Sequence, residues 1–104
     1  MSAVQFHPDA EADLNNIWDY IAADNPQAAD RVVSEIRQAI EMLRSFPGQG
    51  HTISNVASKP ILFHLVREFL IGYIHRDAKL IVLGIFHGRR NPRTIAALMR
   101  QREG

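Results

Sequence analysis

Hydrophobic residues in the first half of the chain recur at helical spacing. Leu14, Ile17, Trp18 and Ile21 occupy positions i, i+3, i+4 and i+7, with polar residues between most of them. This spacing predicts an amphipathic helix that buries one face. We expect Trp18, as part of that face, to pack in the core.

A second helix is predicted after Asp24. Asn25 is a favourable N-cap, and Pro26 fits the first helical turn, where its missing N–H costs nothing. The apolar face that follows comprises Ala29, Val32, Val33, Ile36, Ile40 and Leu43. The two segments therefore predict a helical hairpin over residues 8–46, preceded by a short strand at Val4–Phe6.

The spacing changes in the second half. Residues 47–60 are rich in Gly, Ser and Pro and are predicted to form a loop. Three apolar segments follow within residues 61–88, namely ILFHLV, FLIGYIH and KLIVLGIFH, and they are separated only by short polar breaks. Breaks this short require antiparallel neighbours, so a three-stranded meander is expected. The run LIVLGIF is apolar throughout, which favours a central strand covered on both faces.

The chain is expected to end in a short helix over residues 92–102. Asn91-Pro92 repeats the cap-then-proline signal, and Ile95, Leu98 and Met99 form one apolar stripe. Such a helix can fold back on its own domain or offer the stripe to a partner. The predicted fold is α+β: a small sheet with a short N-terminal strand, backed by a helical hairpin and completed by the meander and a tail helix.

Composition narrows the classes of function. A chain of 104 residues is expected to form a single domain, and the absence of cysteine excludes disulfides, thiolate metal sites and a cysteine nucleophile. The five histidines show no metal-ligand spacing, so neither a metal site nor a cofactor is predicted. No secretory leader and no apolar run of ~20 residues is present. We therefore expect a cytoplasmic protein without membrane contact.

Charge is distributed unevenly along the chain. Residues 1–46 carry eight acidic against three basic residues, whereas residues 47–104 carry nine basic against three acidic ones. Five arginines lie within residues 87–104, which contain a single glutamate. A one-sided basic surface suits an acidic partner, such as a nucleic acid, a protein bound to nucleic acid or an acidic peptide.

Four sequence patterns, in order, resemble the RelE/ParE superfamily of bacterial toxins. They are FHPDAEADLNNIWDYIAADNPQAADRVVSEI, LRSFPGQG, the hairpin Val66–Tyr73, and Ile85-Phe86-His87-Gly88-Arg89-Arg90. The resemblance covers about residues 4–91, and the four patterns lie within this range. The His-Gly-Arg-Arg ending is most similar to the ParE branch, the toxins of type II toxin–antitoxin systems of the plasmid-stabilisation type.

This resemblance implies a toxin that binds and poisons DNA gyrase and thereby arrests growth. It also implies a cognate antitoxin, usually with a ribbon-helix-helix domain, and a toxin–antitoxin hetero-oligomer. The basic segment supplies the candidate target-binding residues, which are His87, Arg89, Arg90 and Arg93. The candidate antitoxin-binding residues are Tyr20, which falls off the apolar stripe of its helix, and Ile95, Leu98 and Met99.

Two alternatives stay open at this point. The RelE branch comprises ribosome-dependent endoribonucleases, and a metal-free ribonuclease needs a base, an acid and cations around the phosphate. The residue types exist here in Arg67, Tyr73, His75, His87 and Arg89. The sheet region nevertheless has few Lys and Arg residues, and no tyrosine follows Tyr73. A non-toxic or decayed binding module of the same fold is the second alternative, and His87 can equally be a structural residue at a strand end.

Overall fold

The computed structural model describes residues 3–49, 51–52 and 61–103. In chain order the elements are β1 (Ala3–Phe6), α1 (Pro8–Ala22), α2 (Pro26–Ser45), the 3₁₀-helix η1 (Pro47–Gln49), β2 (His51–Thr52), β3 (Leu62–Val66), β4 (Phe69–Arg76), β5 (Lys79–His87) and α3 (Pro92–Glu103). The predicted α+β fold is therefore confirmed, with its N-terminal strand, helical hairpin, meander and tail helix.

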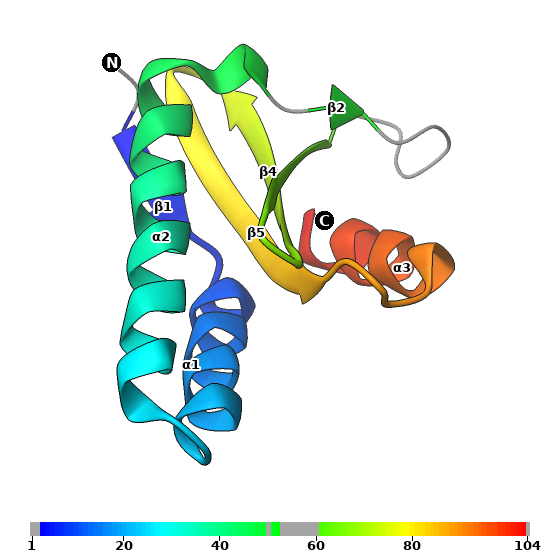
Figure 1. Ribbon diagram of the computed structural model, residues 1–104. Coiled ribbons are helices and arrows are strands. Elements are labelled where there is room, and N and C mark those ends of the chain that lie inside the picture. The colour runs from blue at the N-terminus through cyan, green and yellow to red at the C-terminus, as the bar shows by residue number, and fades with distance from the viewer. Residues whose placement is uncertain (1–2, 50, 53–60, 104) are drawn as a thin grey trace.

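The strands form one mixed sheet in the order β1-β5-β4-β3-β2 (Figure 1). β3, β4 and β5 are successive antiparallel neighbours, as the short polar breaks predict. β1 pairs in parallel with the first half of β5, from Ala3↔Lys79 to Phe6↔Val82. Because β1 ends there, no strand of the described residues pairs with the second half of β5 on that side. This gap matters for the functional surface described below.

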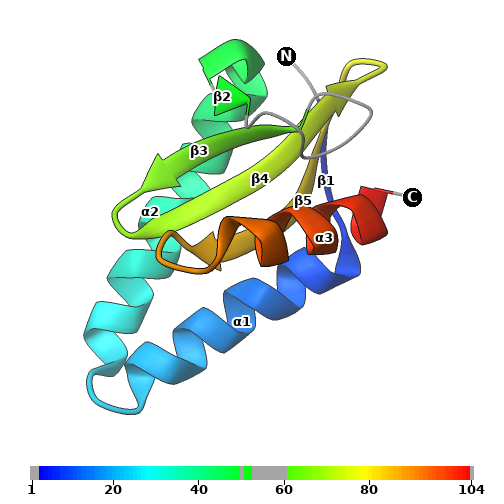
Figure 2. The ribbon, with the colours of Figure 1, turned by 90° about the vertical axis from the view of Figure 1, so that its right-hand side faces the viewer.

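The sheet separates two layers of helix. The hairpin α1–α2 covers one face, and α3 lies across the opposite face (Figures 1 and 2). Each face has its own hydrophobic cluster: the hairpin cluster contains Ile36, Leu43 and Tyr73, whereas the α3 cluster contains Leu83, Phe86 and Met99. The sequence prediction that β5 is a central strand covered on both faces is confirmed.

All three helices begin with a side-chain cap followed by proline. The N–H of Asp9 donates to His7 Nδ1 at 3.0 Å, and the N–H of Ala28 donates to Asn25 Oδ1 at 3.1 Å. Asn91 Oδ1 accepts from the N–H of Arg93 at 2.9 Å. Each cap satisfies a donor that the first helical turn leaves unpaired, which explains why these helices begin where the sequence predicts.

A bulge in β5 redirects its side chains. The pairing passes from Gly72↔Gly84 to Tyr73↔Val82, so β5 holds one more residue than β4 at this point. Val82 therefore faces the hairpin cluster, and so does Ile85 three residues later. An extra residue reverses the alternation of a strand. Before and after the bulge, β5 side chains alternate between the two faces in opposite phase, and both faces carry a hydrophobic cluster. The strand therefore needs apolar residues along its whole length.

Two predictions need correction. Residues 47–60 are not a simple loop, because Pro47–Gln49 form a 3₁₀-helix and His51–Thr52 pair with β3; residues 50 and 53–60 of this predicted loop lie outside the described residues. Trp18 is not a core residue: it is 37% exposed and its indole N–H donates to Asp30 at 2.9 Å. It lies in a groove between α1 and α2, where an amphipathic ring can cover apolar surface while its polar atom stays accessible to water.

Within the described part of the chain, no helix is long and apolar enough to span a membrane.

Candidate functional site

The His-Gly-Arg-Arg segment, residues 87–90, forms a hydrogen-bonded turn at the end of β5, called the basic turn below. The N–H of Gly88 donates to the carbonyl of Glu68 at 2.6 Å, and the N–H of Arg90 donates to the carbonyl of His87 at 3.0 Å. A Cβ at Gly88 would lie 3.2 Å from the Glu68 oxygen. Glycine is thus favoured here because two backbones approach closely. Its φ does not lie in the left-handed region, so the backbone conformation is not the reason.

His87 organises this turn. Its Nδ1 accepts from the N–H of Arg89 at 3.1 Å, and its ring meets Phe69 edge-on with the ring centroids 5.6 Å apart. His7 makes the same kind of contact, because its Nδ1 accepts from the backbone N–H of Asp9, two residues later. His87 therefore has a structural role in addition to its predicted role in target binding.

The three predicted target-binding arginines are exposed on and beside this turn. The guanidinium of Arg90 lies over the Phe86 ring, 5.8 Å from its centroid, in a cation–π contact. In the described ranges of the chain, the side chains of Arg89 and Arg93 form no ion pair. Their charges are thus not neutralised by neighbouring side chains and can act on a partner.

Helix α3 turns its apolar stripe to its own sheet. Ile95 is 3% exposed and Met99 is fully buried, while Leu98 packs partly buried at the edge of the α3 cluster. The facing sheet surface is flat because Gly72 and Gly84 are paired neighbours: a Cβ at Gly72 would lie 2.8 Å from Met99 Sδ. Antitoxin binding by Ile95 and Met99 stays a prediction, and it requires α3 to leave this position.

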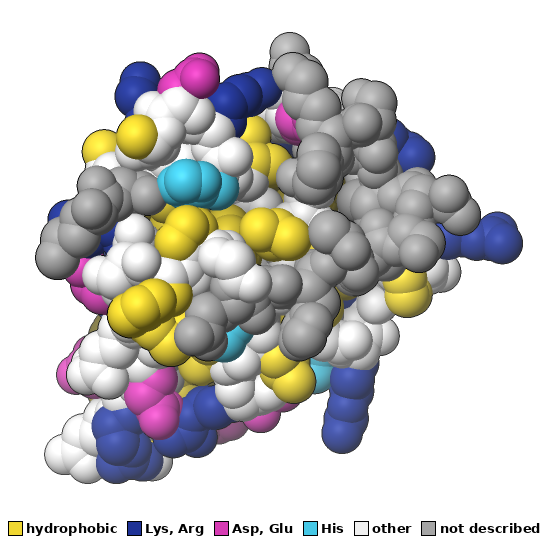
Figure 3. All heavy atoms as spheres, turned by 90° about the horizontal axis from the view of Figure 1, so that it is seen from above, with side chains coloured by type: hydrophobic (Ala, Val, Ile, Leu, Met, Phe, Trp, Pro, Cys, Tyr) yellow, Lys and Arg dark blue, Asp and Glu magenta, His cyan; other side chains and the backbone are white. Residues whose placement is uncertain are grey.

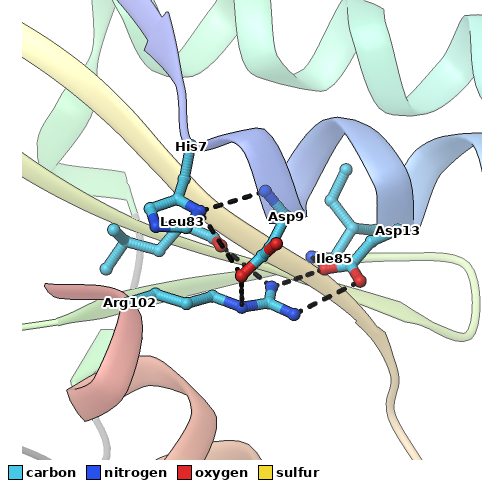
Figure 4. A network of polar contacts seen from close by, with 6 residues as sticks. All are labelled: His7, Asp9, Asp13, Leu83, Ile85 and Arg102. Carbon is cyan, nitrogen blue, oxygen red and sulfur yellow. Dashed lines mark hydrogen bonds and ion pairs between the residues drawn. The ribbon is translucent and has the colours of Figure 1, made fainter.

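Arg102, near the end of α3, reaches around the sheet to α1 (Figure 4). One guanidinium nitrogen, Nη1, donates to Asp13 Oδ2 at 2.7 Å and to the Leu83 carbonyl at 3.0 Å. The Arg102 side chain is 10% exposed and that of Asp13 17%. Asp9 adds a second carboxylate 3.6 Å from Nε. We call this contact between α3 and α1 the Arg102 clamp.

The Arg102 clamp fills the gap that β1 leaves beside β5. Asp13 Oδ2 also accepts from the N–H of Ile85 at 3.1 Å, so a carboxylate and a guanidinium together take the place of a strand's backbone groups. Open strand edges expose unpaired donors and acceptors, which proteins cover by such means. Gly84 makes room for the clamp, because a Cβ there would lie 2.5 Å from Arg102 Nη1.

The Arg102 clamp is not among the sequence predictions, although the sequence contains a signal for it. Asp13 stands three residues after Ala10 and four before Ile17, both of which face the core side of α1. A carboxylate at such a position is buried only when paired, so it predicts a cation from another element. The identity of that cation, 89 residues further along the chain, is not readable from local spacing.

Tyr20 is 83% exposed, as expected from its place off the apolar stripe. It lines a groove of about 410 Å³ between α1 and the ends of β4 and β5, called the Tyr20 groove below. Other lining residues include Ile17, Ile21, Glu68, Phe69, Phe86, His87 and Arg90. The structure thus brings a predicted antitoxin-binding residue and two predicted target-binding residues to one groove.

The residues considered for a ribonuclease do not converge. Tyr73 is fully buried in the hairpin cluster and donates its hydroxyl to the Pro47 carbonyl at 2.6 Å. His75 pairs with Leu80 at one end of the sheet, whereas His87 pairs with Phe69 at the other, six residues along β4. At ~3.3 Å per residue the two histidines are roughly 20 Å apart. In Figure 3, which looks onto the end opposite the basic turn, Lys and Arg side chains are scattered around the rim.

Arg67, in the turn between β3 and β4, is paired with Glu35 of α2. The hydrogen bond that Arg67 Nε donates to the Glu35 carboxylate, and the negative charge of that carboxylate, raise the pKa of Arg67 above its usual value. Arg67 thus links the turn between β3 and β4 to the helical hairpin. Among the described residues, no cluster of three or more His, Asp or Glu side chains is suited to hold a metal ion.

Comparison with known proteins indicates the family to which the chain belongs. A search of curated proteins finds no match. A solved structure described as the chromosomal ParDE TA system from P. aeruginosa is similar in fold, with a TM-score of 0.70 and 20% sequence identity over 84% of this chain and 96% of that one. Residues 4–92 match the family described as the ParE toxin of the type II toxin–antitoxin system, parDE. The chain therefore belongs to the ParE toxin family.

Proposed function

We propose that this protein arrests growth by binding and poisoning DNA gyrase, and that a cognate antitoxin neutralises it. The observation that carries the proposal is the basic turn, where hydrogen bonds from Gly88, Arg89 and Arg90 order the backbone and leave arginine side chains exposed. Binding by a rigid, charged surface requires no acid–base chemistry. The dispersal of Tyr73, His75 and His87 is consistent with that mode of action.

Electrostatics supports a partner with acidic groups. Arg89, Arg90 and Arg93 follow one another over five residues and are all exposed. Such a group accelerates encounter with an acidic protein surface or with phosphate, and guanidinium groups bind carboxylate or phosphate in a bidentate manner. A gyrase–DNA complex presents both kinds of group. Inhibition would then hold the enzyme on cleaved DNA.

The antitoxin is proposed from family membership and not from the charge of the basic turn. Membership of the family implies an antitoxin partner. Its type, which we expect to be ribbon-helix-helix, and the assembly of a toxin–antitoxin hetero-oligomer belong to the proposal. The acidic hairpin, the groove between α1 and α2 that Trp18 lines, and the exposed Tyr20 are available to such a partner in the present structure.

The proposal is tested with the double variant Arg89→Ala/Arg90→Ala. We expect growth arrest on induced expression to be lost, and the toxin concentration that half-inhibits supercoiling of relaxed plasmid to rise at least about tenfold. The matched control is Arg76→Ala/Lys79→Ala, which removes the same charge from the exposed turn at the other end of the sheet. This control should inhibit like the parent protein.

Three results would count against the proposal. The first is a parent protein that leaves gyrase supercoiling unchanged, without linear cleaved plasmid. The second is codon-positioned cleavage of messenger RNA when the protein is added to ribosomes, which would favour the RelE-like ribonuclease. The third is undisturbed growth without antitoxin, which would favour a non-toxic module of the same fold.

A further inference from the structure

The structure joins two surfaces that the sequence treats separately. Tyr20 of α1, assigned by sequence to the antitoxin, lines the same groove as His87 and Arg90, assigned by sequence to the target. We propose that the Tyr20 groove is part of the target-facing surface and that it receives a protein segment in which an apolar side chain is flanked by a carboxylate. This inference rests on the proposed function and names the chemistry of the partner segment.

The apolar half of the groove is suited to a hydrophobic side chain. Ile17 and Ile21, one turn apart on α1, form one wall, and Phe69 and Phe86 at the ends of β4 and β5 contribute to the other. Phe86 is 2% exposed, so the floor is firmly packed, whereas Tyr20 at the rim is 83% exposed. Exposed tyrosines beside a concave apolar surface are frequent anchors of protein interfaces, because they contribute large area at low entropic cost.

The charged half of the groove selects a carboxylate. Asp13 lines the groove, but its carboxylate already accepts from Arg102 and from the Ile85 N–H, so it is neutralised within the protein. Glu68 is the remaining acidic residue of the lining. Its single negative charge is outnumbered by the positive charges of Arg90, which lines the groove, and of the exposed Arg89 and Arg93 beside it. The balance at this end is positive, and charge complementarity therefore favours an acidic partner segment.

The groove is also rigid where the partner would be held. Arg90 is oriented by its contact with the Phe86 ring and by the backbone hydrogen bond that its N–H donates to His87. Preformed geometry of this kind reduces the ordering cost of binding. If the antitoxin also covers Tyr20, it would exclude the target by direct occupation of the groove, without any change in the toxin's conformation.

The test begins with Tyr20→Ala and a matched control. Phe46→Ala removes an aromatic side chain that is 61% exposed at the end of α2, outside the groove. We expect Tyr20→Ala to raise the half-inhibiting concentration in the gyrase supercoiling assay about tenfold or more, with growth arrest weakened in parallel, while Phe46→Ala changes it less than twofold. Thermal unfolding of both variants should match that of the parent protein.

A blocking experiment tests the groove without changing Tyr20. The chain contains no cysteine, so a single introduced thiol can be labelled selectively. Asn16 lines the groove and is exposed. Asn16→Cys carrying a bulky maleimide should inhibit gyrase at least about tenfold more weakly than the same variant before labelling. Labelling of Phe46→Cys, outside the groove, should leave the inhibition by that variant unchanged.

Three outcomes overturn the inference in distinguishable ways, and a fourth overturns the proposed function alone. If Tyr20→Ala and labelled Asn16→Cys inhibit like the parent protein, the target does not use the groove. If Tyr20→Ala arrests growth normally but escapes neutralisation by the antitoxin, the groove belongs to the antitoxin alone. If labelling changes the sedimentation coefficient of the free protein, the groove holds a second copy. If the parent protein arrests growth without inhibiting gyrase, the proposed function fails, and growth arrest by the same variants still decides whether the groove faces the target.

Discussion

The two faces of the sheet are built differently. The hairpin face is covered by two helices, of 15 and 20 residues, and its cluster includes the fully buried Ile36, Leu43 and Tyr73. The opposite face is covered by the single helix α3, with Met99 seated over Gly72 and the Arg102 clamp at its end. One face is held by a wide apolar contact, whereas the other combines a small apolar contact with a polar one.

This difference bears on function because the basic turn connects the two faces. It leaves β5, whose side chains enter both clusters, and continues into α3. The hairpin face should therefore determine whether the protein is folded, and the α3 face should determine how the arginines are presented. Stability within a protein is not uniform, and elements with fewer buried contacts open first.

The largest effect is expected from Ile36→Ala on the hairpin face. Ile36 is fully buried, and removal of most of its side chain leaves a cavity between α2 and the sheet. We expect the free energy of unfolding to fall by about 3–4 kcal/mol. Urea denaturation followed by circular dichroism measures this loss. A change below ~1 kcal/mol would show that the hairpin face is not the main source of stability.

Met99→Ala is the matched substitution on the α3 face. Met99 is also fully buried, but α3 can separate from the sheet while the rest of the domain remains folded. We expect a smaller loss in global stability, about 2 kcal/mol, together with faster amide hydrogen exchange confined to α3. Equal losses for Ile36→Ala and Met99→Ala, with exchange spread over the whole chain, would remove the distinction between the two faces.

Arg102→Met tests the polar part of the α3 contact. The substitution removes the partner of Asp13, whose carboxylate keeps its bond from the Ile85 N–H and some exposure to water. We expect a loss of about 1–2 kcal/mol, since one buried charge is left only partly compensated. Asp13→Asn, made alone and together with Arg102→Met, completes a double-mutant cycle, in which the double variant should lose less stability than the sum of the two single losses. A double-mutant cycle without coupling would contradict the clamp.

The smallest effect is expected at the turn between β4 and β5. Asp77 and Ala78 both have positive φ, 53° and 59°, in this two-residue turn. Such a conformation is costly for alanine and free for glycine, so Ala78→Gly should raise the free energy of unfolding by about 0.5–1 kcal/mol. Because this turn is distant from the basic turn, growth arrest should not change. Calorimetry of the two proteins measures the difference.

Local sequence rules predicted much of the fold. The caps at Asn25 and Asn91, each followed by proline, place two helix starts correctly because capping depends only on neighbouring residues. The polar breaks between β3, β4 and β5 predict antiparallel strands for a similar reason. The exposure of Tyr20 follows from helical periodicity alone.

Contacts between distant segments were decided by the tertiary structure. The parallel pairing of β1 with β5, the bulge opposite Gly72 and the position of Trp18 at the surface depend on how whole elements pack. The Arg102 clamp joins residues 13 and 102. The Tyr20 groove likewise combines side chains of α1 with the ends of β4 and β5.

The sequence by itself determined the three α-helices, the meander and the N-terminal strand, together with the family resemblance and the basic character of residues 87–93, because periodicity, capping and charge are local properties. The tertiary structure decided which of the candidate residues share a surface. It buried Tyr73, separated His75 from His87 and placed Tyr20 beside Arg90, because side-chain neighbourhoods are set by the packing of helices on a sheet rather than by distance along the chain.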